Sequence, residues 1–210
     1  MKNNVLISLS IVALLMIGSV NTASAQRNKN REKTEFVQKD GTKENTVSQS
    51  AKQNAVNDIE SLYAANTAKF DSVKDNVERI RTLIEHPVLR KGDSTRVKFL
   101  INPQVVTALE VKGYGKATPE EIKSGCYTIT IKAEESTFFV FKFSDSNGIS
   151  VGANFIIVTE PENVIEYTTK QNKYIENQDF KSLGEFRKKV VGEEFYRNSL
   201  EQMNIYRKQQ

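Results

Sequence analysis

The sequence predicts an α+β protein: an antiparallel β-sandwich of immunoglobulin-like architecture, flanked by a long N-terminal heptad helix and a C-terminal amphipathic helix. Three observations support this prediction. Apolar residues recur at heptad spacing over 50–86, alternate with polar residues over much of 88–168, and return to helical spacing within 169–210. A period near 3.5 is typical of helices and a period of two is typical of strands. A leader over 1–25 and a linker over 26–49 precede these segments.

Residues 1–25 have the organisation of a cleavable export signal. Lys2 provides a positive charge at the start, and an almost unbroken apolar run covers 5–20. The small residues of 23–25 fit the site of signal peptidase, which predicts cleavage before Gln26. The apolar run is short for a membrane span, which favours cleavage over an uncleaved signal anchor. We therefore expect an exported protein, periplasmic or secreted.

The mature chain is mildly basic and gives no signal for nucleic-acid binding. The whole sequence of 210 residues has a formal net charge of +4, and loss of Lys2 with the leader leaves +3. Recognition of nucleic acid needs a clustered basic face, so no nucleic-acid partner is expected. Residues 26–49 contain too few apolar groups to offset their ordering entropy, which predicts a flexible linker. No later stretch is long and apolar enough to predict a stable membrane span in the mature chain.

The segment 50–86 carries the heptad pattern. Ser50 and Gln53 form a capping-box pattern at its start, and Pro87 disfavours helix at the residue before it. Such a helix is about 50 Å long at 1.5 Å per residue. The residues of the apolar seam are Val56, Ile59, Tyr63, Asn66, Phe70, Val73, Val77, Ile80 and Ile84.

A seam of this length needs a partner. The candidates are a second copy of the chain, the C-terminal helix, or the face of a sheet. Asn66 either fixes the register between copies or lies at the edge of the stripe. The sequence therefore predicts a protein partner or self-association through the helix 50–86, with Tyr63, Asn66 and Phe70 as candidate interaction residues.

Alternating residues predict a block of short strands, and turn signals between them favour a sandwich or a small barrel. Asn147-Gly148 suits a hairpin turn, and Gly152 indicates a bulge. The chain has no Trp and one cysteine, so the immunoglobulin-like prediction concerns architecture alone. Cys126 is interpreted as a small buried hydrophobe, with an intermolecular disulfide as the alternative. The predicted strands are 95–101, 104–112, 126–133, 136–143, 149–158 and a short one at 164–168.

The loop 113–125 is the second candidate interaction surface. Loops displayed on a rigid scaffold often carry binding function, which makes Tyr114 a candidate contact residue. The alternative is an ordinary loop aromatic that packs on the sheet. Within the loop, Thr118 and Pro119 have the pattern of an N-cap and a first helical residue.

The C-terminal third returns to helical spacing. Residues 169–181 are polar and predict a loop, and Ser182 with Glu185 suggests a capping box. The following apolar stripe reaches about Arg207, and Gly192 divides or kinks it. This stripe is a natural mate for the N-terminal helix; a membrane-binding basic helix is the alternative, weakened by several glutamates in it.

No motif for catalysis, cofactors or metals is found. His86 is the only histidine, beside Pro87, and nothing nearby in the sequence supports a zinc site or a nucleophile. Asp145 resembles the start of a calcium loop, but Ser150 and Ile156 occupy the positions that require glycine and glutamate. We therefore expect no catalytic, cofactor-binding or metal-binding residues and no enzymatic activity.

These observations favour an exported, non-enzymatic binding or structural assembly protein of the bacterial cell envelope. The alternative is a periplasmic chaperone-like assembly factor, which requires the helix seam to remain partly open. Burial of Val56, Phe70 and Val77 distinguishes the two. An envelope hydrolase is the third hypothesis, and the sequence nominates no residues for it.

Overall fold

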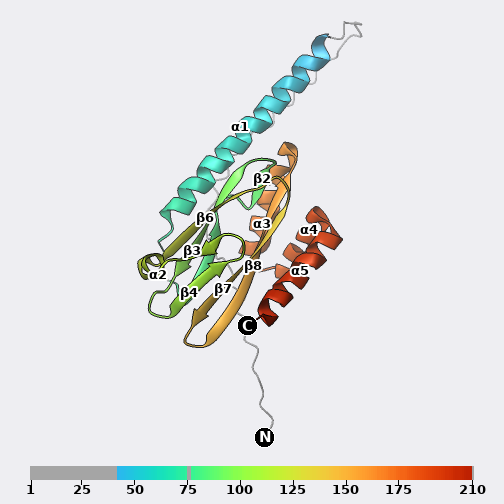
Figure 1. Ribbon diagram of the computed structural model, residues 1–210. Helices are drawn as coiled ribbons and strands as arrows, with labels where there is room; N and C mark the ends of the chain where they lie inside the picture. The colour runs from blue at the N-terminus through green and yellow to red at the C-terminus, as the bar shows by residue number, and fades with distance from the viewer. Residues whose placement is uncertain (1–41, 75–76, 210) are drawn as a thin grey trace.

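The computed structural model describes residues 42–74 and 77–209, with side chains from residue 53 onwards. The protein is α+β, with two sheets and flanking helices (Figure 1). The predicted leader and the linker up to residue 41 lie outside the described residues. The helices are α1 Thr42–Ser72, α2 Pro119–Ser124, α3 Pro161–Glu176, α4 Phe180–Val191 and α5 Glu193–Lys208. The strands are β1 Ile80–Ile84, β2 Val88–Arg90, β3 Ser94–Ile101, β4 Val106–Val111, β5 Gly115–Lys116, β6 Cys126–Lys132, β7 Thr137–Asp145 and β8 Gly148–Thr159.

The strands form a three-stranded sheet in the order β1-β3-β6 and a five-stranded sheet in the order β2-β8-β7-β4-β5. All pairs are antiparallel except β2 with β8, which run parallel. The chain passes from one sheet to the other between β1 and β2, at His86 and Pro87. The strands predicted from 95 to 158 are confirmed, with shifts of one or two residues at their ends.

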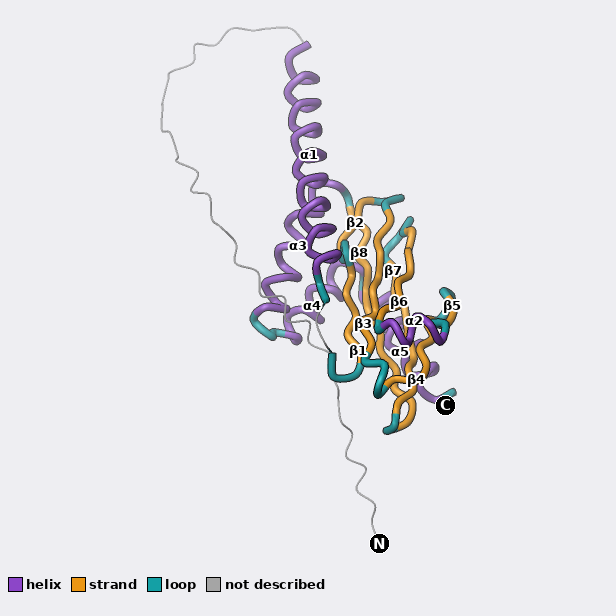
Figure 2. Tube along the Cα trace, turned by 90° about the vertical axis from the view of Figure 1, so that its left-hand side faces the viewer, coloured by secondary structure: helices purple, strands orange, loops and turns teal. Residues whose placement is uncertain are grey.

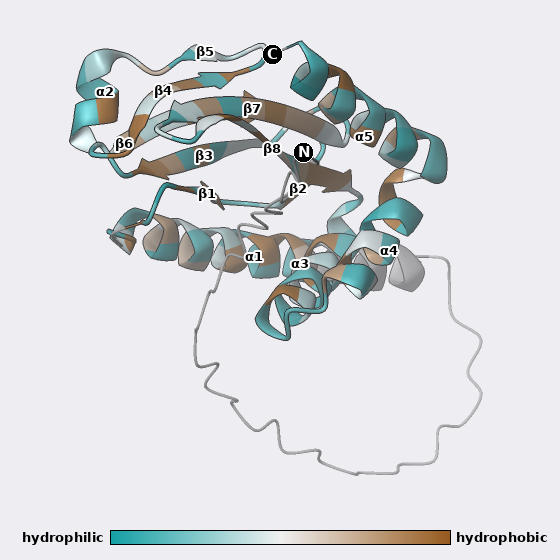
Figure 3. Ribbon diagram, turned by 90° about the horizontal axis from the view of Figure 1, so that it is seen from below, coloured by the Kyte–Doolittle hydropathy of each residue, from teal (hydrophilic) through white to brown (hydrophobic). Residues whose placement is uncertain are grey.

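The core lies between the two sheets. One continuous apolar cluster takes residues from both, including the fully buried Phe99 of β3, Leu109 of β4 and Phe139 of β7. Phe99 meets the edge of Phe141 with ring centroids 5.1 Å apart. Burying one such side chain contributes roughly 1.5–3 kcal/mol. Apolar residues therefore concentrate along the strands, as the hydropathy colouring of Figure 3 shows.

Gly152 has a different role from the predicted bulge. The pairing of β7 with β8 is continuous, with Gly152 opposite Phe141. A Cβ at Gly152 would lie 2.3 Å from Cζ of Phe141. The glycine is therefore needed because the Phe141 ring occupies the space of a side chain.

The predicted helix 50–86 differs from the structure at both ends. Helix α1 begins at Thr42, so Ser50 lies inside it and does not act as its cap. It ends at Ser72, and Ile80–Ile84 is a strand paired with β3. The sequence pattern was misleading because Ile80 and Ile84 are four residues apart, a spacing that fits both a helix turn and two strand repeats.

The segment after β8 is also corrected. The predicted strand 164–168 and most of the predicted loop 169–181 belong to α3. Pro161 occupies the first turn of this helix, where its missing N–H costs nothing. The buried residues Val164, Thr168 and Gln171 follow at helical spacing. A polar helix with one narrow buried face was mistaken for a loop.

The two remaining helical predictions are confirmed in outline. Thr118 caps α2 in a capping box with Glu121, and Gly192 separates α4 from α5. The N-cap of α4 is Asp179 rather than Ser182, whose backbone N–H donates to the Asp179 carboxylate at 3.0 Å. None of the helices in the described residues is long and apolar enough for a membrane span.

The helices cover the sheets on two sides. Helix α1 packs against α3 and along the strands β1, β2 and β3, and its N-terminal turns project past the sheets (Figures 1 and 2). Helices α4 and α5 lie on the outer face of β7 and β8. The main mate of α1 is thus α3 with the strands, while Phe186 and Val190 of the predicted C-terminal stripe pack against the same apolar cluster as Ile59.

Candidate functional site

Helix α1 is fastened to the sheets at two apolar points, the first of which is Phe70. Its side chain is 3% exposed and packs with Leu83 of β1 and Leu100 of β3. The cations of Lys98 and Arg96 lie 4.4 and 4.9 Å from the centre of its ring. Lys98 Nζ also donates to the Phe70 carbonyl at 2.8 Å, near the C-terminal end of α1, where a cation favours the helix dipole.

Ile59, three turns earlier, is the second apolar point. It is fully buried with Val88 of β2, Ile157 of β8 and Val164 of α3. Between Ile59 and Phe70 one face of α1 is therefore occupied by the protein's own residues. The remaining N-terminal part, Thr42 to residue 58, is roughly 25 Å long at 1.5 Å per residue.

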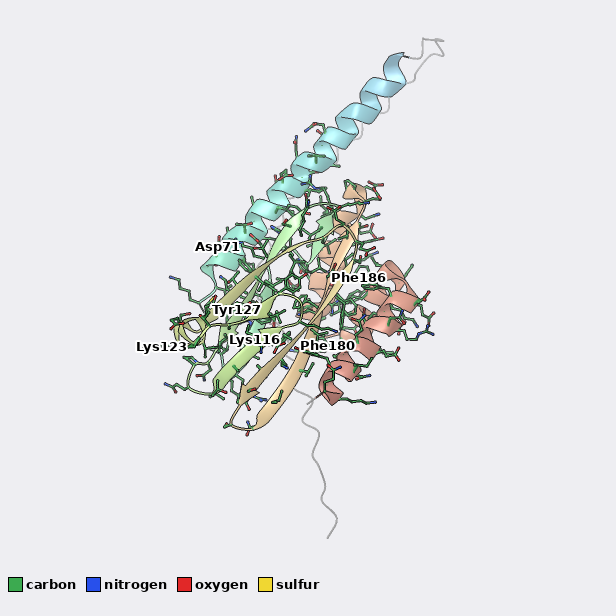
Figure 4. The ribbon with its side chains drawn as sticks, in the orientation of Figure 1. Asp71, Lys116, Lys123, Tyr127, Phe180 and Phe186 are labelled. Carbon is green, nitrogen blue, oxygen red and sulfur yellow. The ribbon has the colours of Figure 1, made fainter. Side chains whose placement is uncertain are left out.

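An ion pair on the three-stranded sheet, between the buried carboxylate of Glu85 and the partly exposed guanidinium of Arg96, contacts α1. Arg96 donates two hydrogen bonds, of 2.7 and 2.9 Å, to the carboxylate of Glu85. Thr67 of α1 donates to the same carboxylate at 2.7 Å, and Asp71, labelled in Figure 4, pairs with Arg96 at 3.0 Å. The hydrogen bonds from Arg96, and then that from Thr67, lower the pKa of Glu85 to about 2. This ion pair is satisfied on all sides, as a buried pair must be to avoid a net cost.

Tyr63 makes a third attachment. The backbone N–H of Arg90 donates to the Tyr63 hydroxyl at 3.1 Å, and the Tyr63 ring stacks on His86 with centroids 4.3 Å apart. The Arg90 guanidinium then pairs with Glu60 of α1 and with Asp93, each at 2.7 Å. Burial raises the pKa of Tyr63 to about 12, so its phenol stays neutral.

His86 is a structural residue of the strand crossover. It is 6% exposed, and its backbone N–H donates to Thr95 Oγ1 at 2.8 Å. Burial lowers the pKa of the imidazole, which keeps it neutral at neutral pH. In residues 42–74 and 77–209, no group of three or more His, Cys, Asp or Glu side chains could hold a metal ion. The side chains of this arrangement attach helix α1 to the sheets.

The four candidate residues from the sequence fall into two places. Tyr63 and Phe70 meet the sheets at the α1 attachment, where both face inward, and Asn66 is half-buried on the same helix. Tyr114 lies apart from them, 38% exposed in the loop after β4, and its carbonyl accepts a hydrogen bond of 3.4 Å from Tyr127.

Sequence reasoning missed Glu85 and Arg96. Each already had a place in a predicted element and therefore gave no separate signal. Glu85 fell within the predicted helix 50–86, and Arg96 lay on the polar side of a predicted strand. A signal existed in the alternation of β3, because Arg96 and Lys98 share the face of the apolar Leu100. Such a face is covered by another element, and the two charges on it need partners.

Comparisons with known proteins give no family. No protein-family model matches the chain, and no curated protein is significantly similar to it. Among solved structures, the soluble domain of PmoD from Methylocystis sp. ATCC 49242 (Rockwell) matches with a TM-score of 0.26 and 11% identity. The match covers 41% of this chain and 96% of the PmoD chain. At this TM-score the likeness carries no argument about fold or function.

Proposed function

We propose that this protein is an exported, non-enzymatic binding or assembly protein of the bacterial cell envelope. Its body is a β-sandwich of immunoglobulin-like architecture, and α1 is a stalk that joins this body to the segment before it. The observation that carries the proposal is the attachment of α1. Its C-terminal half is fixed by apolar contacts and ion pairs, while its N-terminal turns extend beyond the body.

The strand order supports the architectural part of the proposal. In immunoglobulin-like sandwiches one sheet contains strands C, F and G and the other contains A, B and E. The order β8-β7-β4 corresponds to G-F-C, with β5 in the place of C′, and β1-β3-β6 corresponds to A-B-E. The family hallmarks of a Trp and a cysteine pair are absent, so the correspondence is one of topology.

The stalk needs rigidity where it meets the body, and the attachment provides it. Phe70 and Ile59 are buried three turns apart on one face of α1, and Thr67 and Asp71 join the helix to Glu85 and Arg96. A force or a partner on the projecting turns is therefore transmitted to the sheets. This is what an assembly protein requires, and it needs no catalytic group.

The burial of the helix seam divides on the chaperone-like alternative, which requires the seam to remain partly open. Phe70 is buried, which counts against this alternative, while Val56 and Val77 are half-buried and leave part of the seam accessible.

Site-specific photo-crosslinking in the native bacterium tests the proposal. The full chain carries a crosslinking residue at Asn54 on the projecting part of α1, at Tyr114, or at the exposed Gln104 as a matched control. We expect a discrete adduct from Asn54 or Tyr114, none from Gln104, and mature protein that begins at Gln26. Adduct formation equal at all three positions, or none at any, would overturn the binding role. A protein retained in the cytoplasm would overturn the export.

A further inference from the structure

The C-terminal helices enclose an aromatic cluster on the outer face of β8. Phe155 is 6% exposed, and Tyr196 of α5 stacks on it with ring centroids 5.3 Å apart and planes inclined by 11°. The guanidinium of Arg187, from α4, lies 5.6 Å from the centre of the same Phe155 ring. Nearby, Phe186 of α4, labelled in Figure 4, packs against Tyr167 of α3.

Among the described residues, no ion pair joins Arg187 to an acidic side chain, in contrast to three other half-buried arginines. Arg79, Arg90 and Arg96 each pair with an aspartate or a glutamate. Within the described part of the chain, Arg187 is engaged by Gln171, whose Oε1 accepts from Nε at 3.1 Å, and by the Phe155 ring. Burial lowers the pKa of Arg187 to about 10, so the side chain remains charged at neutral pH. A desolvated cation without an anion is costly.

Gln171 of α3 presents a second unmet donor at the same place. It is 1% exposed, and among the residues that the structure describes its Nε2 has no hydrogen-bond partner. The orientation of the amide follows from chemistry, because arginine can only donate and therefore needs the oxygen of Gln171. The Nε2 group is thus left as a buried donor directly beside the guanidinium. A buried N–H of this kind is normally satisfied by protein or by water.

Tyr196 completes the polar side of the cluster. Its hydroxyl lies against Gly184, where a Cβ would come within 3.3 Å of the oxygen. The absence of a side chain at Gly184 leaves room for this hydroxyl between α4 and α5. A guanidinium and a primary amide from two helices therefore meet at 3.1 Å, and the Tyr196 ring from a third helix stacks on the same Phe155 ring as the guanidinium.

We propose that Arg187, Gln171 and Tyr196 form a binding site for the carboxylate group of a small ligand. A carboxylate is planar and has two acceptor oxygens, so it matches the free N–H groups of a guanidinium and leaves a lone pair for the Gln171 amide. It also supplies the negative charge that Arg187 lacks. This inference stands on residues that the proposed stalk and body do not use, and it is independent of that function.

The test follows the side-chain signals of Arg187 by NMR in the mature chain, residues 26–210. Acetate is titrated through the millimolar range at constant ionic strength, with acetamide as the uncharged ligand of the same shape. We expect a saturable shift of the Arg187 Nε–H signal with acetate and none with acetamide. Phosphate distinguishes a carboxylate site from a general anion site.

Matched variants separate binding from folding. Because Arg187→Met lacks the guanidinium signal, the Tyr196 ring signals are followed as well, and the saturable shift that acetate causes in the wild type should be absent in this variant. Gln171→Leu should weaken acetate binding about fivefold to tenfold, the value of one lost hydrogen bond. Arg197→Met, at an exposed position on α5, should change nothing. Circular dichroism checks that each variant is folded. A linear response to acetate, an equal response to acetamide, tighter binding of phosphate, or unchanged acetate binding in folded Arg187→Met would each overturn the proposal.

Discussion

The two helical covers of this protein treat buried charge in opposite ways. Under α1, on the three-stranded sheet, Glu85 and Arg96 are paired with each other and with Thr67 and Asp71. Under α4 and α5, on the five-stranded sheet, Arg187 has no acidic partner among the described residues. Helix α1 is joined to its sheet by charged side chains that pair with one another. Helices α4 and α5 are held mainly by aromatic packing, and the Arg187 cation among them has no acidic partner in the described residues.

We interpret the paired charges beneath α1 as a structural attachment and the unpaired Arg187 as part of the proposed ligand site. A buried pair whose hydrogen bonds are complete holds its two elements in one arrangement, and loss of either member leaves an uncompensated charge. A buried cation without its counter-ion lowers stability until an anion arrives. The comparison therefore predicts opposite responses to mutation on the two sides of the molecule.

The largest expected effect is at the apolar point of the α1 attachment. Phe70→Ala should lower the free energy of unfolding by about 3–5 kcal/mol, because it opens a cavity beside Leu83 and Leu100. Urea denaturation followed by circular dichroism measures the change. Leu200→Ala on α5, where the side chain is 38% exposed, is the control and should cost less than about 1 kcal/mol. Equal losses in both variants would contradict the attachment.

The ion pair comes next. Arg96→Met should cost about 3 kcal/mol, because Glu85 would remain buried without its partner. The double variant Glu85→Leu/Arg96→Met should recover most of this loss, since both charges are then removed. Urea titrations of the wild type, Glu85→Leu, Arg96→Met and the double variant give the coupling energy. If the double variant were as unstable as the sum of its single changes, the two side chains would act independently.

The same pair predicts a loss of stability in acid. The folded-state pKa of Glu85 is about 2, below its usual 4.5, so the unfolded chain binds a proton first as the pH falls. Stability is present above about pH 4.5 and is lost progressively towards pH 2, by about 2–3 kcal/mol. The lowered pKa of His86 adds a loss of the same sign below about pH 6.5. Glu85→Gln should flatten the profile between pH 4.5 and 2, and a wild-type slope there would exclude Glu85 as its cause.

The smallest effect is expected at Arg187, and it sharpens the contrast. In buffer free of carboxylates, Arg187→Met should change the free energy of unfolding by less than about 1 kcal/mol. Removal of a desolvated charge offsets the loss of its one hydrogen bond. Thermal and urea unfolding measure the change against that of Arg96→Met. A loss as large as the one at Arg96 would show that Arg187 fastens its helix as well.

Periodicity alone located strands β3, β4, β6, β7 and β8 and the division of the C-terminal helix at Gly192, but neither β1 nor β2. It failed where two periods coincide, at Ile80 and Ile84, and where one face of a polar helix is narrow, around Gln171. It placed Tyr63 and Phe70 on the important face of α1 but could not name what covers them. The charged partners Glu85 and Arg96 are eleven residues apart on paired strands, and their meeting depends on register, which a single strand pattern does not reveal.

The central claim is that α1 is attached to its own body from Ile59 to Phe70 and projects before that. Amide hydrogen exchange of the mature chain, measured at several protein concentrations, tests it most directly. The account predicts strong protection over 59–70, much faster exchange over 53–58, and no dependence of either on concentration. Protection that is uniform along α1 and weakens on dilution would instead mean that the helix is held by a second copy of the chain.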